Sequence, residues 1–138
     1  MGTRCLTVFN TEKGKEIVVM YRQHDGYPDG HGKELAEFLS GFKLVNGMRG
    51  DEPPKFANGM SCLAAQVVAK FKDEPGSIYL YPAGTRDTGE EYIYIVSGEI
   101  GQEPIIEIQD SDGLMLAKGT PDEILKFIAT PAPEEEES

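Results

Sequence analysis

The chain has no tryptophan, only two cysteines and only two histidines among its 138 residues. Cys5 and Cys62 lie far apart and show no metal-type spacing, so we expect reduced, buried thiols rather than a disulfide or a ligand pair. No apolar run approaches the length that spans a bilayer, and no basic segment followed by an apolar one opens the chain. These absences predict a cytoplasmic protein that does not bind membranes.

Basic residues are also scarce. Lysine and arginine total 13 against 24 aspartates and glutamates, which gives a formal net charge of −11. Four of those charges form the run 134–137, so the rest of the chain carries −7. Such a surface repels nucleic-acid phosphates, which argues against direct binding of DNA or RNA. It suits instead a partner protein with a basic surface.

Six segments have the β-branched and aromatic composition of strands, and the polar, glycine-bearing linkers 10–15 and 110–113 predict tight hairpins. The predicted strands are Cys5–Phe9, Glu16–Arg22, Ser77–Tyr81, Tyr92–Val96, Ile105–Gln109 and Leu114–Lys118.

Three further segments have the apolar spacing of amphipathic helices. The first is a short stripe from Leu35 to Phe42, and the second runs from Met60 to Phe71 with Asn58 as its N-cap. The third begins at a Thr120–Glu123 capping box. Between the first two helices, residues 43–55 hold two glycines and two consecutive prolines, which is typical of a surface excursion.

The resulting order, β-β-α-α-β-β-β-β-α, lacks the regular βαβ alternation of a doubly wound sheet. We therefore expect an α+β fold, in which a mostly antiparallel sheet of about six strands carries about three helices. Residues 1–130 are expected to form a single domain, and the acidic tail 131–138 is expected to be disordered.

The polar loop from Tyr21 to Lys33 is the candidate site, because loops held between rigid elements often bind ligands. Its end, Gly30–Lys33, opens a helix, so free N–H groups and an ammonium would suit a phosphate or carboxylate. Two arginines from other segments would join if the fold gathers these loops at one end of the sheet. The candidate ligand-binding residues are Arg22, His24, Asp25, Tyr27, His31 and Lys33 of the loop, with Arg4 and Arg86 from elsewhere.

Other chemistry is less well supported. His24, Asp25, Asp29 and His31 offer imidazoles and carboxylates to a divalent ion, but their spacing matches no metal motif and Asp-Gly pairs form turns. Ser61 has no nucleophile-elbow sequence around it. We predict no metal, no cofactor and no catalytic residue, so the balance is against an enzyme.

Two stretches, Met1–Thr7 and Tyr21–Gly32, resemble an uncharacterised family of small bacterial and phage proteins. That family has a Met-Gly/Ala-Thr-Arg opening and an Asp-Gly-Tyr-Pro loop followed by glycine. The resemblance continues through residues 56–60 and 79–82 to about Tyr94. It implies a phage or mobile-element setting and carries over no catalytic residue, because the family has no assigned activity.

Two functions follow as hypotheses. The first is a non-catalytic acidic binding protein, a phage accessory that blocks or sequesters a host component, such as one of defence or nucleic-acid handling. The second is a small-molecule site on the 21–33 loop for a nucleotide-type or other anionic ligand, acting as a sponge or a metal-dependent hydrolase.

Overall fold

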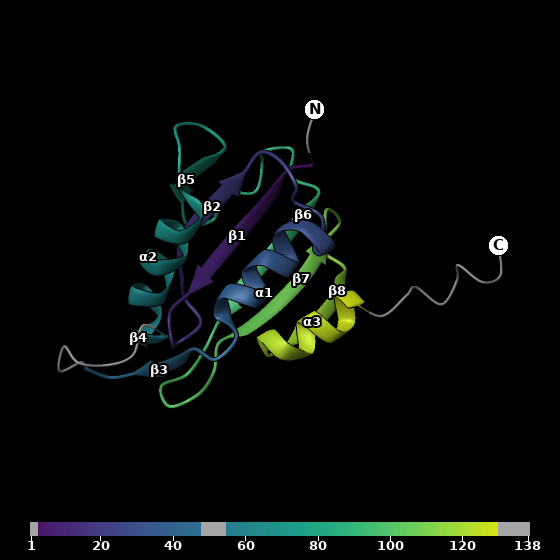
Figure 1. Ribbon diagram of the computed structural model, residues 1–138. Coiled ribbons are helices and arrows are strands. Elements are labelled where there is room, and N and C mark those ends of the chain that lie inside the picture. The colour runs from purple at the N-terminus through teal and green to yellow at the C-terminus, as the bar shows by residue number, and fades with distance from the viewer. Residues whose placement is uncertain (1–2, 48–54, 130–138) are drawn as a thin grey trace.

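The computed structural model describes residues 3–47 and 55–129 and has the expected α+β architecture (Figure 1). A six-stranded sheet has the order β5-β2-β1-β6-β7-β8, and every neighbouring pair is antiparallel except β1–β6. The strands are β1 (Cys5–Asn10), β2 (Glu16–Arg22), β5 (Ile78–Pro82), β6 (Tyr92–Ser97), β7 (Ile105–Asp110) and β8 (Met115–Gly119).

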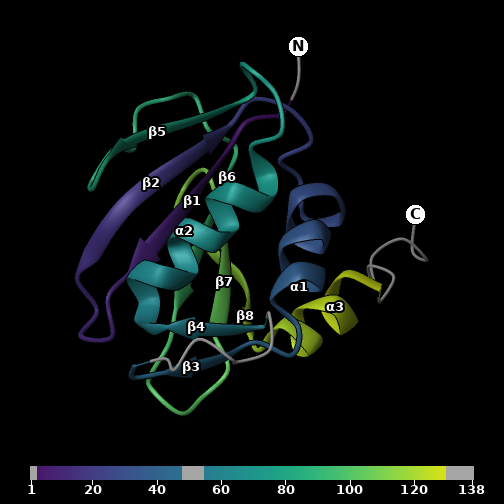
Figure 2. The same ribbon diagram turned by 60° about the vertical axis from the view of Figure 1, so that its left-hand side comes forward.

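The helices α1 (Lys33–Leu39), α2 (Gly59–Phe71) and α3 (Pro121–Ala129) all cover the same face of this sheet (Figure 2). Alternate residues of the strands, such as Phe9 and Tyr94, point towards the helices and are fully buried against them. None of the helices within residues 3–47 and 55–129 has the length and apolar character needed to cross a membrane.

The opposite face of the sheet is apolar, and no helix within residues 3–47 and 55–129 covers it. Leu6, Val8 and Val19 on this face are nevertheless buried. The segment 83–91, which joins β5 to the parallel strand β6, returns along this side of the sheet (Figure 2). We call it the strap.

The strap is held at both ends of the sheet. At one end Arg86 forms an ion pair of 2.9 Å with Glu16, whose carboxylate also accepts from the Gly84 N–H. At the other end the Glu91 N–H donates to the Arg4 carbonyl at 2.8 Å. The Arg86 guanidinium, which donates to Glu16, lowers the pKa of that carboxyl. The loop is therefore held over the apolar sheet face by an ion pair at one anchor and a main-chain hydrogen bond at the other.

The region between α1 and α2 differs from the prediction of a surface excursion. Residues Lys43–Val45 form β3, which pairs in parallel with β4 (Phe56–Asn58) in a separate two-stranded sheet. Leu44 is fully buried, and its carbonyl accepts from the Gly101 N–H at 2.7 Å. A short apolar pair flanked by glycine gives little sequence signal for a strand, and residues 48–54 of the excursion lie outside the described part.

The helix ends differ from the apolar pattern at one place and confirm it at another. The predicted apolar stripe runs to Phe42, but α1 ends at Leu39 because Gly41 adopts a φ of +87°. Phe42 is buried all the same, as part of the connection. The Thr120–Glu123 capping box of α3 is confirmed, since the Thr120 N–H donates to the Glu123 carboxylate at 2.9 Å and the Glu123 N–H to the Thr120 hydroxyl at 3.3 Å.

The N-terminus of α2 is capped differently from the prediction. Asn58 occupies the cap position, but its side-chain oxygen accepts from the Gly47 N–H at 2.8 Å rather than from the helix. The Met60 N–H instead donates to the Glu12 carboxylate, from the β1–β2 hairpin, at 2.7 Å. A carboxylate at the positive end of a helix stabilises it, so this cap also fastens the hairpin to α2.

This cap can be measured directly. We expect Glu12→Ala to lower the free energy of unfolding by about 1–2 kcal/mol, because α2 loses a charge-assisted cap. Lys13→Ala is the matched control, since Lys13 is an exposed neighbour in the same hairpin. Urea denaturation of both variants checks the prediction, and equal midpoints for the two would show that Glu12 does not act as the cap.

Candidate functional site

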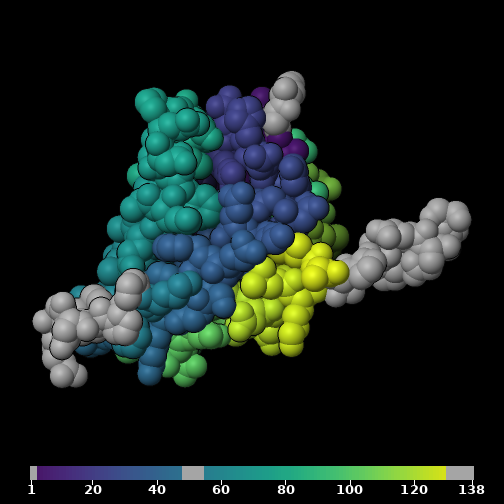
Figure 3. Space-filling model, in the orientation of Figure 1, coloured from purple at the N-terminus to yellow at the C-terminus, as the bar shows by residue number. Residues whose placement is uncertain are grey.

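A groove of about 780 Å³ lies between α1 and the C-terminal half of α2, next to the loop that follows β2. In Figure 3 the surfaces of α2 (teal) and α1 (blue) are both turned towards the viewer. Aromatic and aliphatic side chains and a rim of charged groups line it. The lining includes Phe38, Phe71 and Ile78, the cations Arg22, Lys55 and Lys70, the carboxylates Asp25, Glu34, Glu37, Asp73 and Glu74, and His24.

The loop reaches the groove through a sharp reversal at Asp25-Gly26. Asp25 has a φ of +63°, and a Cβ on Gly26 would lie 2.8 Å from the Cys5 Cβ, so only glycine fits there. The Tyr94 hydroxyl donates to the Gly26 carbonyl at 2.6 Å, and the His31 N–H donates to the Asp25 carbonyl at 2.7 Å. The turn therefore folds back over β1 and directs residue 31 into the core.

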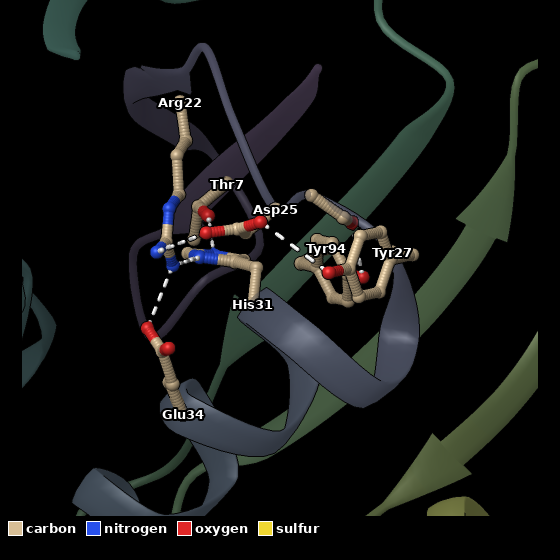
Figure 4. Close-up of polar contacts among 8 residues, drawn as sticks. Thr7, Arg22, Asp25, Tyr27, His31, Glu34 and Tyr94 are labelled. Atoms are coloured by element: carbon tan, nitrogen blue, oxygen red, sulfur yellow. Dashed lines mark hydrogen bonds and ion pairs between the residues drawn. The ribbon is translucent and has the colours of Figure 1, made fainter. Parts of the chain in front are cut away.

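His31 is the centre of the polar contacts in Figure 4. Its side chain is fully buried, with the ring 5.0 Å from that of Phe71 and 4.9 Å from that of Tyr94. Arg22 Nη1 lies 3.1 Å from His31 Nδ1, and Thr7 Oγ1 lies 2.7 Å from His31 Nε2. A guanidinium can only donate, so Nδ1 is the acceptor and the imidazole proton lies on Nε2, from which it is donated to Thr7.

Burial and the nearby Arg22 charge keep this imidazole neutral. Loss of solvation is the larger cause and the guanidinium the second, and together they lower the pKa of His31 from 6.5 to about 3. His31 is thus an acceptor for Arg22 and a donor to Thr7, and its ring is not exposed to a ligand in the groove.

Arg22 connects this buried histidine to the groove. Besides donating to His31, its Nη1 donates to Glu34 at 2.8 Å, and its Nη2 lies 3.9 Å from the Asp25 carboxylate. The guanidinium also lies over the Phe71 ring, 5.6 Å from the centroid. The Arg22 side chain is only 14% exposed, so most of its hydrogen-bonding and stacking capacity is used inside the protein.

The other candidate residues fall into separate places. His24 and Asp25 line the groove with Arg22. Tyr27 is exposed and donates to Asp25 at 3.3 Å, and Asp25 is the main reason that the pKa of Tyr27 is raised. Lys33 is exposed at the first position of α1 but does not line the groove.

Arg4 and Arg86 do not join the groove residues. Both contact or belong to the strap, and Arg86 pairs with Glu16 at the far end of β2 from Arg22. Arg4 does lie at the Arg22 end of the sheet, since Cys5 pairs with Arg22, but it does not line the groove. Of the two arginines expected to join Arg22, Arg86 is at the opposite end.

Several groove residues were not predicted. Glu37 belongs to α1 and Lys70 to α2. Asp73 and Glu74 follow α2, and Lys55 directly precedes β4. In the sequence they are ordinary charged residues beside apolar stripes. Only the placement of α1 beside α2 on the sheet (Figure 2) shows that they surround one groove.

Backbone strain also concentrates in this groove. Asp25 and Ser77 are the non-glycine residues with positive φ in the described part of the chain, at +63° and +70°, and both line the groove. Such conformations are held only by their surroundings and are enriched at binding sites.

The electrostatics of the groove favour a cation. The lining has five carboxylates and three basic side chains, and these eight groups carry a net charge of −2. Arg22 is engaged as described, and the Lys55 ammonium donates to the carbonyls of Phe38 and Ser40, both at 2.8 Å. Within the described residues, no hydrogen bond or ion pair engages the carboxylates of Glu37, Asp73 or Glu74. Outward-facing negative charge is therefore more available than positive charge.

The described residues contain no obvious reactive centre. They hold no group of three or more His, Cys, Asp or Glu residues placed to bind a metal ion. Cys5 is buried beneath the Asp25-Gly26 turn, and burial raises the pKa of its thiol far above the ordinary value. Cys62 packs against the core and donates to Gln66 at 3.3 Å.

The neutral state of His31 predicts an unusual pH dependence. Between pH 6.5 and about 3 the unfolded chain binds a proton at this residue that the folded chain does not, so stability falls as the pH is lowered. We expect the free energy of unfolding to fall by up to about 1.4 kcal/mol per pH unit from pH 6.5 down to about 5, where most carboxylates are still ionised.

Urea denaturation at a series of pH values tests this in the wild type, in His31→Gln and in His24→Gln. We expect the slope to persist in His24→Gln, which changes the exposed histidine, and to disappear in His31→Gln. Imidazole nitrogen NMR of the wild type should show His31 in the Nε2–H form at pH 5. A protonated His31 at that pH would contradict the buried, neutral assignment.

The groove is thus an acidic, partly aromatic cavity whose basic residues are largely engaged by the protein itself. Comparison of the chain with protein-family models, with curated proteins and with solved structures found no significant match.

Proposed function

We propose that the chain is a non-catalytic binding protein that holds a basic segment of a partner protein in the groove between α1 and α2. Its biological setting, proposed from the resemblance of Met1–Thr7 and Tyr21–Gly32, is a phage or mobile-element accessory that blocks or sequesters a host component. The basic surface of a nucleic-acid-handling or defence protein is a target of the right charge.

One observation carries this proposal. In the groove, Arg22 and Lys55 are engaged by groups of the protein itself, whereas the carboxylates of Glu37, Asp73 and Glu74 are not engaged by any described residue. A ligand that supplies an arginine or lysine would pair with these carboxylates without displacing an existing contact. A ligand that supplies an anion would compete with Glu34 for Arg22.

The aromatic lining also favours a cationic ligand over an anionic one. The Arg22 guanidinium already stacks on Phe71, and the Lys55 ammonium lies 5.8 Å from the Phe38 ring centroid. Phenyl rings beside carboxylates attract cations through the ring quadrupole as well as through charge, and arginine benefits most because its planar group also stacks. The expected ligand is therefore a peptide segment that contains arginine.

Anion binding is the second candidate. Arg22, Lys55 and Lys70 line the groove together with His24, so a phosphate that displaced Glu34 would find three cations nearby. This alternative places a nucleotide-type ligand in the same groove and predicts the opposite response to charge reversal.

Peptide titration tests the proposal. We expect an arginine-containing peptide to raise the melting temperature and to perturb the amide NMR signals of groove residues, because ligands of the folded state stabilise it by mass action. An acidic peptide of the same length should do neither. Raising the salt concentration should weaken binding, since the attraction is electrostatic and partly exposed.

Charge reversal locates the site. We expect the double variant Asp73→Lys/Glu74→Lys to weaken peptide binding about tenfold or more, which corresponds to about 1.4 kcal/mol. Glu99→Lys/Glu103→Lys is the matched control, because it changes the net charge equally at a different pocket near β7. If peptide binding weakened equally in both variants, the effect would be one of overall charge and the groove would not be the binding site. Stabilisation by inorganic phosphate or a nucleotide, strengthened by Asp73→Lys/Glu74→Lys, would favour the anion alternative.

A further inference from the structure

The edge strand β5 presents three consecutive large apolar side chains to solvent. Tyr79, Leu80 and Tyr81 are 44%, 53% and 37% exposed. The two tyrosines point to the strap face of the sheet, where each ring lies 6.0 Å from that of Tyr21, while Leu80 points to the helix face. An exposed apolar edge strand is a ready template for pairing with another chain.

The hydrogen-bond pattern fixes which main-chain groups of β5 face outwards. The Gln23 N–H donates to the Ser77 carbonyl at 2.9 Å, just beyond the ladder in which Arg22 pairs with Ile78. Hydrogen-bonded and non-hydrogen-bonded pairs alternate along antiparallel strands. Tyr79 and Tyr81 therefore bond to β2, and the main-chain groups of Ile78, Leu80 and Pro82 point away from the sheet.

At both ends of β5 the outward-facing main-chain groups already have hydrogen-bond partners within the chain. The Ile78 N–H donates to the Gly76 carbonyl at 2.7 Å, and the Ile78 carbonyl accepts from the Lys72 ammonium at 2.9 Å. At the other end Pro82 has no N–H, and its carbonyl accepts from the Thr85 hydroxyl at 2.8 Å. The N–H and carbonyl of Leu80, at the centre, have no such internal partner in the described chain.

We propose that β5 is a self-association surface, which pairs antiparallel with β5 of a second copy across a two-fold axis at Leu80. In this arrangement each Leu80 N–H donates to the other Leu80 carbonyl, so the groups left free in each copy satisfy one another. A longer foreign strand would meet the closed ends at Ile78 and Pro82, whereas the two-fold pair needs only the central residue. The second copy is therefore the occupant that fits.

The side chains of β5 match this symmetry. The segment Ile-Tyr-Leu-Tyr-Pro is nearly palindromic about Leu80, so the two-fold places Tyr79 opposite the other copy's Tyr81 on one face and Leu80 beside Leu80 on the other. Aromatic and aliphatic cross-strand pairs stabilise antiparallel sheets. Every exposed apolar side chain of the strand thereby gains an apolar neighbour.

The charged groups at the strand ends do not oppose this pairing. Lys72 lies at the Ile78 end, and Glu16, which is ion-paired with Arg86, lies just beyond the Pro82 end. Antiparallel pairing brings the Lys72 end of one copy to this neutral ion pair of the other, so no like charges meet. Since each chain carries a net charge of −11, added salt should favour the dimer by screening the overall repulsion. This association is independent of the groove proposed above for a basic peptide.

Sedimentation equilibrium of the full chain tests the dimer. We expect a reversible monomer–dimer equilibrium that Leu80→Arg weakens about tenfold or more, because two charges would meet at the axis. Met115→Arg is the matched control, since Met115 is 54% exposed on the opposite edge strand β8, and it should leave the equilibrium within about twofold of the wild type. A wild-type chain that stays monomeric at about 1 mM, or a Leu80→Arg chain that dimerises as the wild type does, would overturn the proposal.

Disulfide trapping tests the register. Under mild oxidation Leu80→Cys should cross-link to itself, because residues opposite one another lie within the Cα distance that a disulfide spans. Tyr79→Cys and Tyr81→Cys should each fail to cross-link alone but should cross-link when mixed. The wild type, with Cys5 and Cys62 present, measures the background. Efficient self-linking of Tyr79→Cys, or no linking of Leu80→Cys, would exclude pairing centred on Leu80.

Discussion

The structure depends on a chain of hydrogen bonds that runs from the buried Thr7 through His31 and Arg22 to Glu34 at the surface. It joins β1, β2 and α1, and Phe71 of α2 covers both the imidazole and the guanidinium. Each member satisfies its neighbour, and no buried side-chain nitrogen or oxygen in the described residues is left without a partner. A buried polar network that is fully satisfied fixes the relative positions of the elements that supply it.

This network also accounts for two of the five carboxylates that line the groove. A positive charge close to the core must be balanced, and the polar groups that approach Arg22 are a neutral imidazole and the carboxylates of Glu34 and Asp25. Arg22, the most basic residue of the loop, therefore serves to hold the fold together. The surrounding carboxylates and the two phenyl groups of the groove remain for a partner to contact.

The sequence was sufficient for the fold class, because period-two strands, helical stripes and hairpin turns depend on neighbouring residues. It failed where the partner is distant. Asn58 has the composition of an N-cap, but Glu12 from the first hairpin provides the carboxylate. Residues 43–45 pair with β4 because Leu44 is buried against the loop around Gly98, which no local pattern reveals.

For the candidate site, too, local sequence predicted some placements and could not predict others. The density of polar residues in the 21–33 loop led to Arg22, His24 and Asp25, which do meet in the groove. It could not show that His31 turns inwards, because Gly-His-Gly resembles an exposed turn until Phe71 and Tyr94 enclose the ring. Nor could it place Arg86, whose distance from the groove follows from the strap running the length of the sheet.

The parallel pairing of β1 with β6 has a consequence for how the chain assembles. Cys5 lies beside Tyr92, so the first strand to leave the ribosome acquires its second neighbour only after most of the chain has been made. Until then one side of the β1–β2 hairpin is an open apolar ladder with Leu6 and Val8 uncovered. Arrival of the strap and β6 pairs the free edge of β1 and covers Leu6 and Val8 in the same event, and only then can β7 and β8 extend the sheet.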